Sequence, residues 1–129
     1  MGFRGSEKTN RGGDEVSGEA LKVLFLCSRN HWRSPTAEAI YKKFPGVDAR
    51  SAGTSPNARI KVNGGHIGWA DFIFVMEKRH QQILQQRFNN DLSGNRVVCL
   101  DMPDDYEFMD EDLVMTLKDR LRPFIPVPD

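Results

Sequence analysis

A cysteine and an arginine separated by five residues constrain the fold of this 129-residue chain more than any other sequence feature. The apolar run at residues 21–26 predicts a buried strand, and residues 35–44 predict a helix, so that Cys27 and Arg33 lie in the loop between them. Ser34 suits the N-cap of this helix, and a proline follows it in the first helical turn. The loop is therefore expected to lie against a helix N-terminus.

A loop in this position can bind a dianion such as phosphate. Its backbone N–H groups can converge on one point, where the helix dipole adds to their positive field. Arg33 can donate a bidentate pair of hydrogen bonds to two phosphoryl oxygens, and the same field favours the nucleophilic thiolate form of Cys27. A buried structural cysteine beside a surface arginine is the alternative interpretation. The expected phosphate-binding loop is Ser28, Arg29, Asn30, His31, Trp32 and Arg33.

Strands and helices are expected to alternate along the rest of the chain. Strands are predicted at about residues 21–27, 47–52, 72–76 and 96–100, and helices at about 35–44, 77–88 and 110–122. This alternation predicts an α/β fold with a parallel sheet and helices on both faces. In such sheets a ligand lies beyond the carboxyl ends of the strands, which is where Cys27 and residues 101–106 both fall.

Two stretches carry less structural signal. Residues 1–20 contain five glycines and almost no large apolar side chain, so we expect a flexible N-terminal extension before a domain at residues 21–125. Between residues 57 and 67, a helical turn at 59–62 is conceivable, but Gly64 and Gly65 are expected to break it.

The sequence also resembles the low-molecular-weight protein tyrosine phosphatases. Residues 23–39 are similar to the opening of that family. They contain Val-Leu-Phe-Leu-Cys, then Asn, then Arg-Ser-Pro-Thr-Ala-Glu-Ala. Residues 51–54, 71–76 and 102–106 are similar to further family segments in the same order. The resemblance covers about residues 21–124. It implies a four-stranded parallel sheet in the order 2-1-3-4, the phosphotyrosine phosphatase I-like fold.

The resemblance also implies roles for several loop residues. Ser34 would hydrogen-bond the sulfur of Cys27 and stabilise the thiolate as a leaving group. Asn30, which tolerates left-handed backbone angles, would hold the loop in shape through a partner such as Ser51. Many relatives carry a second cysteine where this chain has Trp32, so a protective disulfide at that place is not expected. His31 and Trp32 are expected to line the mouth of the site. A Cys–His pair involving His31 is a less favoured alternative.

An acidic segment follows the last strand: residues 101–112 hold seven acidic residues and no basic one. A solvated loop, a magnesium site and a general acid are the three interpretations. Neighbouring carboxylates repel each other, so one of them holds its proton more firmly, as a general acid must. The family usually has Asp-Pro-Tyr-Tyr where this chain has Asp104-Asp105-Tyr106-Glu107. We expect Asp104 to be the acid, with Asp105 as the open alternative. We expect a substrate pocket of Trp32, Tyr106 and Asp105, in which Tyr106 stacks on an aryl group.

Composition bounds the possible partners. Lys plus Arg and Asp plus Glu both number 18, and this zero net charge argues against a dedicated nucleic-acid binder. No apolar segment is long enough to span a membrane, so no membrane partner is expected. The two cysteines do not form a disulfide framework, and a thiolate nucleophile needs a reducing setting, so we expect a cytoplasmic protein. No metal or other cofactor is expected.

These features predict a phosphomonoester hydrolase with a phosphocysteine intermediate and an aspartate general acid/base. The expected catalytic residues are Cys27, Arg33, Ser34 and Asp104, and the expected substrate is a tyrosine-phosphorylated protein or a small aryl phosphate. An arsenate reductase could use the same loop, but it needs further cysteines, and Cys99 lies in an apolar strand. A phospho-ligand binding module without turnover, in which Arg29 or Glu107 impairs catalysis, is the other alternative.

Overall fold

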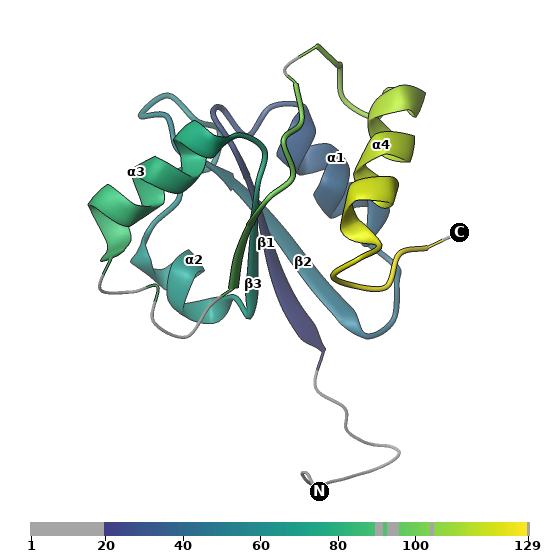
Figure 1. The fold of residues 1–129 in the computed structure, drawn as a ribbon, viewed down its shortest axis with the longest axis horizontal. Coiled ribbons are helices and arrows are strands. Elements are labelled where there is room, and N and C mark those ends of the chain that lie inside the picture. The colour runs from purple at the N-terminus through teal and green to yellow at the C-terminus, as the bar shows by residue number, and fades with distance from the viewer. Residues whose placement is uncertain (1–19, 90–91, 93–95, 104, 129) are drawn as a thin grey trace, which may run out of the picture.

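The structure is a computed structural model, and it describes residues 20–89, 92, 96–103 and 105–128. Strands and helices alternate strictly along these residues (Figure 1). In chain order they are β1 (Leu21–Cys27), α1 (Arg33–Ile40), β2 (Val47–Gly53), α2 (Gly64–Trp69), β3 (Phe72–Val75), α3 (Lys78–Phe88), β4 (Arg96–Cys99) and α4 (Glu111–Leu121).

The four strands form one parallel sheet in the order β2-β1-β3-β4. This order confirms the predicted α/β fold. The central strand β1 pairs with β2 over its whole length and with β3 from Val23 to Leu26. Val23, Leu24, Phe25 and Leu26 are fully buried, as expected of a parallel strand covered on both faces.

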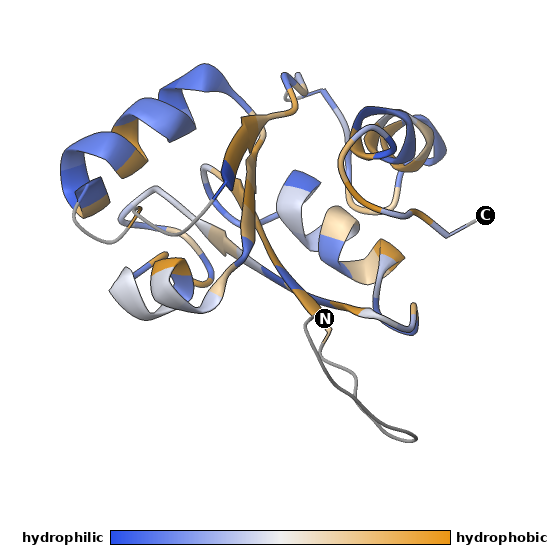
Figure 2. Cartoon of the chain, turned by 60° about the horizontal axis from the view of Figure 1, so that its bottom comes forward, coloured by the Kyte–Doolittle hydropathy of each residue, from blue (hydrophilic) through white to orange (hydrophobic). Residues whose placement is uncertain are grey.

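Helices cover both faces of the sheet, α1 and α4 one face and α2 and α3 the other (Figure 1). Alternate residues of β1 face opposite sides: Val23 and Phe25 belong to the core under α1 and α4, and Leu24 and Leu26 to the core under α2 and α3. In Figure 2 the hydrophobic colour follows the strands, whereas much of α3 is hydrophilic on its outer surface. The sequence pattern thus produces three layers.

The first helix differs from its predicted start. α1 begins at Arg33, its N-cap is Trp32, and the structure shows no side-chain hydrogen bond capping that end. The prediction of Ser34 as the N-cap was therefore wrong. Ser34 is fully buried inside the first turn, where its hydroxyl contacts the loop. The helix also ends at Ile40, earlier than the predicted residue 44.

The glycine pair expected to break a helix instead begins one. Gly64 and Gly65 open α2, and a reciprocal cap stabilises this short helix. The side chain of Asn63 accepts a hydrogen bond from the backbone N–H of His66 (3.0 Å), while Nδ1 of His66 accepts one from the N–H of Asn63 (3.1 Å). Ile67 is fully buried against the sheet, so capping and packing together outweigh the low helix propensity of glycine.

The carboxyl ends of the strands meet at one edge of the molecule, at the top of Figure 1. The loop after β1 and the segment after β4 lie next to each other there, since Arg33 donates a hydrogen bond to the carbonyl of Met102. Asp101 turns the chain out of β4 with a φ of 57°. This edge is where the fold class predicts a ligand site.

Two further expectations concern the ends of the chain and membranes. Residues 1–19 of the predicted extension lie outside the described residues, so the extension stays a prediction. Among the residues that the structure describes, no helix has the length and apolar character needed to cross a membrane.

Candidate active site

The loop after β1 turns its carbonyl groups outward. Four consecutive carbonyl oxygens accept hydrogen bonds from the chain segment that follows β2. These bonds are Thr54 N–H to Cys27 O (3.0 Å), Ser55 N–H to Ser28 O (2.8 Å), Arg59 N–H to Arg29 O (3.0 Å) and Arg59 Nε–H to Asn30 O (3.2 Å). In a trans peptide the next N–H points away from the carbonyl, so the N–H groups of residues 28–31 turn inward.

The inward side of the loop encloses a small cavity of about 90 Å³, lined by Cys27, Ser28, Arg29, His31, Trp32 and Arg33. We call this cavity the cradle. Its walls carry inward N–H groups, the start of a helix and an arginine, which together provide a site for an anion. The structure therefore brings the predicted phosphate-binding residues to one place.

Gly53, the last residue of β2, allows the loop to lie against the sheet. A Cβ atom at this position would be 2.6 Å from the carbonyl oxygen of Ser28 and 2.9 Å from the backbone nitrogen of Asn30. Both neighbours are backbone atoms and cannot rotate away. The close packing of β2 against the loop therefore requires glycine at position 53.

Asn30 lies at the centre of the network that supports the loop. It is fully buried, adopts a left-handed φ of 55°, and donates from Nδ2 to Ser51 Oγ (2.8 Å) and to Ser34 Oγ (3.0 Å). Ser51 in turn donates to a carboxylate oxygen of Glu38. Asn30 therefore makes the contact with Ser51 that the family resemblance implied, and it links the loop to β2 and α1.

The sulfur of Cys27 lies at the base of the cradle, 3.0 Å from the hydroxyl oxygen of Ser34. Asn30 donates to this hydroxyl, so Ser34 can donate its own proton to another acceptor. Two acceptors lie near Ser34 Oγ, and the Cys27 sulfur is nearer than the carbonyl oxygen of Ala52, which is 3.4 Å away. A hydroxyl donating to sulfur stabilises a thiolate relative to a thiol. Ser34 thus makes the contact with Cys27 that the family resemblance implied.

Arg33 is held from its Nη1 side. This nitrogen donates to Glu77 Oε2 (2.5 Å) and to the carbonyl of Met102 (2.9 Å), and only 2% of the side chain is exposed. Burial of Glu77 acts to raise its pKa, but hydrogen bonds and charges of Arg79 and Arg33 outweigh this effect and lower the pKa of Glu77. Glu77 therefore stays ionised and fixes the plane of the guanidinium beside the cradle.

His80 is a site residue that the sequence interpretation missed. It is fully buried, and its Nδ1 accepts a hydrogen bond from the N–H of Glu77 (3.1 Å), which places the ring proton on Nε2 in the neutral form. Nε2 then donates to Ser28 Oγ (2.9 Å). The capping-box spacing of Glu77 and His80 at the start of α3 is the sequence signal that could have found it.

The mouth of the cradle is aromatic. His31 and Trp32 stack with their ring centroids 4.9 Å apart, and 39% of Trp32 is exposed. Of the other predicted pocket residues, Tyr106 is half-buried and packs against the core under α1 and α4, while Asp105 is exposed. Asp104, the predicted general acid, lies outside the described residues.

The acidic segment is held near both of its ends, by Thr36 of α1 at one end and by Arg120 of α4 at the other. The hydroxyl of Thr36 donates to the carbonyl of Trp32 (2.7 Å) and accepts the N–H of Met109 (2.9 Å). At the other end, Nη1 of Arg120 donates to the carbonyl oxygens of Leu100 (2.6 Å) and Asp101 (2.8 Å). These contacts hold the described flanks of the segment close to Arg33 and Trp32.

Comparison with known proteins gives the same fold. No family model matches the chain. The YwlE arginine phosphatase from Geobacillus stearothermophilus aligns with a TM-score of 0.59 and 22% identity over 80% of this chain and 91% of that chain. Wzb from Vibrio vulnificus in complex with benzylphosphonate aligns with a TM-score of 0.65 and 21% identity, over 82% of this chain and 97% of that chain. The tyrosine phosphatase Wzb from Escherichia coli K30 in complex with phosphate aligns with a TM-score of 0.66 and 18% identity, over 82% of this chain and 96% of that chain.

One curated relative is similar in sequence. A protein-arginine-phosphatase from Geobacillus stearothermophilus is 29% identical over 52% of this chain, and the match spans 62% of the length of that relative. With these structural neighbours, it confirms the resemblance that the sequence indicated: the chain has the fold of solved structures that include a low-molecular-weight protein tyrosine phosphatase, and its sequence resembles a curated protein-arginine-phosphatase.

Proposed function

We propose that this protein is a cysteine-dependent phosphatase that hydrolyses phosphomonoesters, with phosphotyrosine as its substrate class. The observation that carries the proposal is the contact between the nucleophile and its hydrogen-bond donor, Cys27 Sγ to Ser34 Oγ at 3.0 Å, at the base of the cradle. A structural cysteine needs neither this donor nor a ring of outward carbonyl groups around it.

In the first step, the Cys27 thiolate attacks phosphorus and the bond from phosphorus to the leaving oxygen breaks. The inward N–H groups of the loop and Arg33 stabilise the three equatorial oxygens as charge moves onto them. We assign to Asp104 the transfer of a proton to the leaving oxygen. The products of this step are the free alcohol or phenol and a phosphocysteine.

In the second step, water attacks the phosphocysteine while Asp104 accepts a proton from it. The bond between phosphorus and sulfur breaks, inorganic phosphate forms, and Cys27 leaves as a thiolate. Ser34 stabilises this thiolate through its hydroxyl, so its contribution is largest when the sulfur departs. Each step is balanced without a metal or an external redox partner.

Hydrolysis of p-nitrophenyl phosphate tests the proposal at the level of the reaction. We expect turnover that is unchanged by EDTA and inhibited competitively by vanadate, because N–H groups and Arg33 form the anion site. Loss of activity on chelation, with recovery on adding magnesium, would contradict the mechanism. Anion binding without turnover would identify a phospho-ligand binding module instead.

A protein-arginine phosphatase is the second candidate, favoured by the curated relative of that name. The acidic segment offers a chemical reason, because Asp105, Glu107 and Asp110 are exposed and carboxylates suit a cationic guanidinium leaving group. The same thiolate attack would then break a bond between phosphorus and nitrogen. Comparing kcat/KM for phosphotyrosine and phosphoarginine peptides of matched sequence separates the two candidates.

A further inference from the structure

A second and larger cavity, of about 530 Å³, lies beside the cradle on the outer side of α1 and the start of β2. We call it the α1–β2 groove. It is lined by His31, Pro35, Glu38, Ala39, Tyr41, Lys42, Val47, Asp48, Ala49, Arg59 and Phe108. Apart from His31, none of these residues lines the cradle, although Arg59 and Glu38 support its loop from outside.

The groove adjoins the cradle at His31, which lines both cavities. The cradle, at about 90 Å³, is the smaller of the two and is enclosed by the loop. A substrate whose phosphoryl group occupies the cradle must place the rest of its structure outside. His31 therefore marks the boundary across which an extended substrate would pass into the groove.

The lining chemistry of the groove suits a polypeptide. Pro35, Ala39 and Val47 provide apolar surface, and Phe108 adds an aromatic ring that is 52% exposed. A half-apolar floor with charged residues at its margins is typical of surfaces that bind extended peptides.

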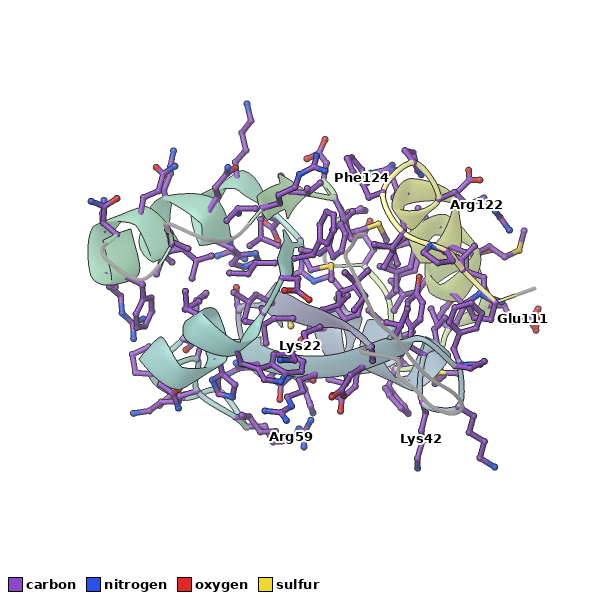
Figure 3. All side chains as sticks on the ribbon, turned by 90° about the horizontal axis from the view of Figure 1, so that it is seen from below. Lys22, Lys42, Arg59, Glu111, Arg122 and Phe124 are labelled. Carbon is purple, nitrogen blue, oxygen red and sulfur yellow. The ribbon has the colours of Figure 1, made fainter. Side chains whose placement is uncertain are left out.

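Charges of both signs surround this apolar surface. Lys42 and Arg59 provide positive charge, and Figure 3 shows both on the same side of the molecule, beside β2. Asp48 provides an exposed negative charge, whereas the negative charge of Glu38 is half-buried and hydrogen-bonded to Ser51. The balance among exposed groups favours acidic residues in the bound segment.

The edge of the sheet borders the same groove. β2 is one of the two edge strands of the described sheet and pairs with β1 on one side; Val47, Asp48 and Ala49 at its start line the cavity. Only its carboxyl end, at Gly53, has a further bridge, to Lys61, among the described residues. An edge strand has backbone N–H and C=O groups to which an extended peptide can hydrogen-bond.

We propose that the α1–β2 groove binds the polypeptide that flanks the phosphorylated side chain, so that the substrate is a phosphoprotein with an extended, acidic local sequence rather than a small phosphate ester. This inference rests on the proposed function. It adds a binding site for the flanking chain to the cradle that binds the phosphoryl group.

The test compares substrates that differ only in flanking chain. N-acetyl phosphotyrosine amide reaches the cradle but not the groove, whereas nine-residue phosphotyrosine peptides with acidic or basic flanks reach both. We expect kcat/KM to be roughly tenfold or more higher for the acidic peptide than for the amide, as burial of one or two apolar side chains in the groove would give. Equal kcat/KM for the amide and both peptides would overturn the proposal.

Two groove variants and a matched control localise the effect. Ala39→Gln fills part of the groove without adding charge and should raise KM for the acidic peptide roughly tenfold, with kcat little changed. Lys42→Glu should raise KM for the acidic peptide a few-fold and lower it for the basic one. Lys43→Glu makes the same charge change at the next exposed residue, which does not line the groove, and should leave both values unchanged.

Turnover of p-nitrophenyl phosphate separates failure of this inference from failure of the proposed function. If every variant hydrolyses p-nitrophenyl phosphate normally and discriminates peptides as the unmodified protein does, the groove is not the peptide site, while the phosphatase proposal stands. If the unmodified protein hydrolyses no phosphate ester, the proposed function itself fails. Melting temperatures of the variants exclude unfolding as the cause of a raised KM.

Discussion

The hydroxyl group of Ser34 connects Asn30, which supports the loop, to Cys27, the proposed nucleophile. It accepts a hydrogen bond from Asn30 and contacts Cys27 Sγ at 3.0 Å, in a fully buried position. Hydrogen bonds to charged groups contribute about 1.5–3 kcal/mol, which corresponds to roughly 10- to 150-fold in rate. A thiolate leaving group gains this stabilisation only after the phosphocysteine begins to break.

Replacement of Ser34 with Ala should therefore slow the second step more than the first. We expect kcat for p-nitrophenyl phosphate to fall roughly 10- to 100-fold, with a burst of p-nitrophenol close to one equivalent per active site. Stopped-flow absorbance measures both quantities. A slow reaction without a burst would place the loss in the first step and remove this role from Ser34.

The ion pair between Arg33 and Glu77 predicts a dependence of stability on pH. Because the pKa of Glu77 is lowered in the folded state, its contribution to stability is complete above the usual value of 4.5 and is lost as the pH falls through the lowered pKa. Glu77→Gln removes the charge and keeps an oxygen acceptor. We expect it to lower the free energy of unfolding by about 1–2 kcal/mol at pH 7.

Urea unfolding at several pH values measures this difference. The gap between Glu77→Gln and the unmodified protein should shrink steadily below pH 4.5, since protonated glutamic acid and glutamine are both neutral. Asp48→Asn, at an exposed position, controls for removing an acid from the surface. A gap that is the same at pH 7 and at pH 3 would show that the Glu77 charge does not support Arg33.

Individual residues were predictable where their role depends on neighbours in sequence. Asn30 and Ser34 lie within the loop motif, and the structure gives both the contacts that the family resemblance implied. His80 and Glu77 are 44 or more residues from their loop partners, so only the folded sheet brings them together. A local pattern shows that they cap α3 but not which loop they contact.

Among the secondary-structure elements, the strands were the most predictable. β1 and β3 carry the buried apolar runs expected of strands covered on both faces, and all four strands begin where the sequence predicted. The helix starts were harder, since α1 begins without a side-chain cap and α2 begins with two glycines. Packing on the sheet outweighs local propensity at the start of α1, and in α2 it does so together with the cap formed by Asn63 and His66.

The acidic segment is the element on which the assignment of the general acid depends. Arg120 fixes its start and Thr36 holds Met109 near its end. The sequence did not predict these attachments, because they join elements distant in the chain. The segment between them contains both candidate acids, and the mechanism distinguishes them by their dependence on the leaving group.

Asp104→Asn should cost roughly 10²- to 10⁴-fold in kcat with a phosphotyrosine peptide, because a poor leaving group needs a proton. The loss should be much smaller with an activated phenol such as p-nitrophenol. Asp105→Asn serves as the matched variant and should cost less than tenfold with either substrate. A leaving-group-dependent loss in Asp105→Asn alone would show that the family alignment in this segment is displaced by one residue.

For the whole molecule, the three layers place Cys27, Arg33 and Ser34, which the structure describes, at one edge of the sheet. The strand order, the helices on both faces and the position of the loop followed from alternating patterns and from the family resemblance. The α1–β2 groove did not, because its lining residues come from α1, from β2 and from the segments that follow β2 and β4. A surface assembled from separate elements leaves no contiguous signal in the sequence.

The domain boundary predicts a further property of the whole chain. Deletion of residues 1–20 should leave the melting temperature and the turnover of p-nitrophenyl phosphate nearly unchanged, because this segment has almost no apolar side chains with which to pack. Differential scanning calorimetry and a steady-state assay measure both properties. A fall of more than several degrees would show that the segment packs on the domain.

The most direct test of the account is the combination of turnover and anion binding in the Cys27→Ser variant. If Cys27 is the nucleophile and the loop N–H groups with Arg33 form the anion site, turnover of p-nitrophenyl phosphate should be abolished. Phosphate binding, measured by calorimetry, should meanwhile be retained within a few-fold. Residual turnover above a few per cent of the unmodified rate would contradict the assignment of Cys27 as the nucleophile. Loss of phosphate binding together with turnover would contradict the proposal that the loop N–H groups and Arg33 bind the anion independently of the Cys27 sulfur.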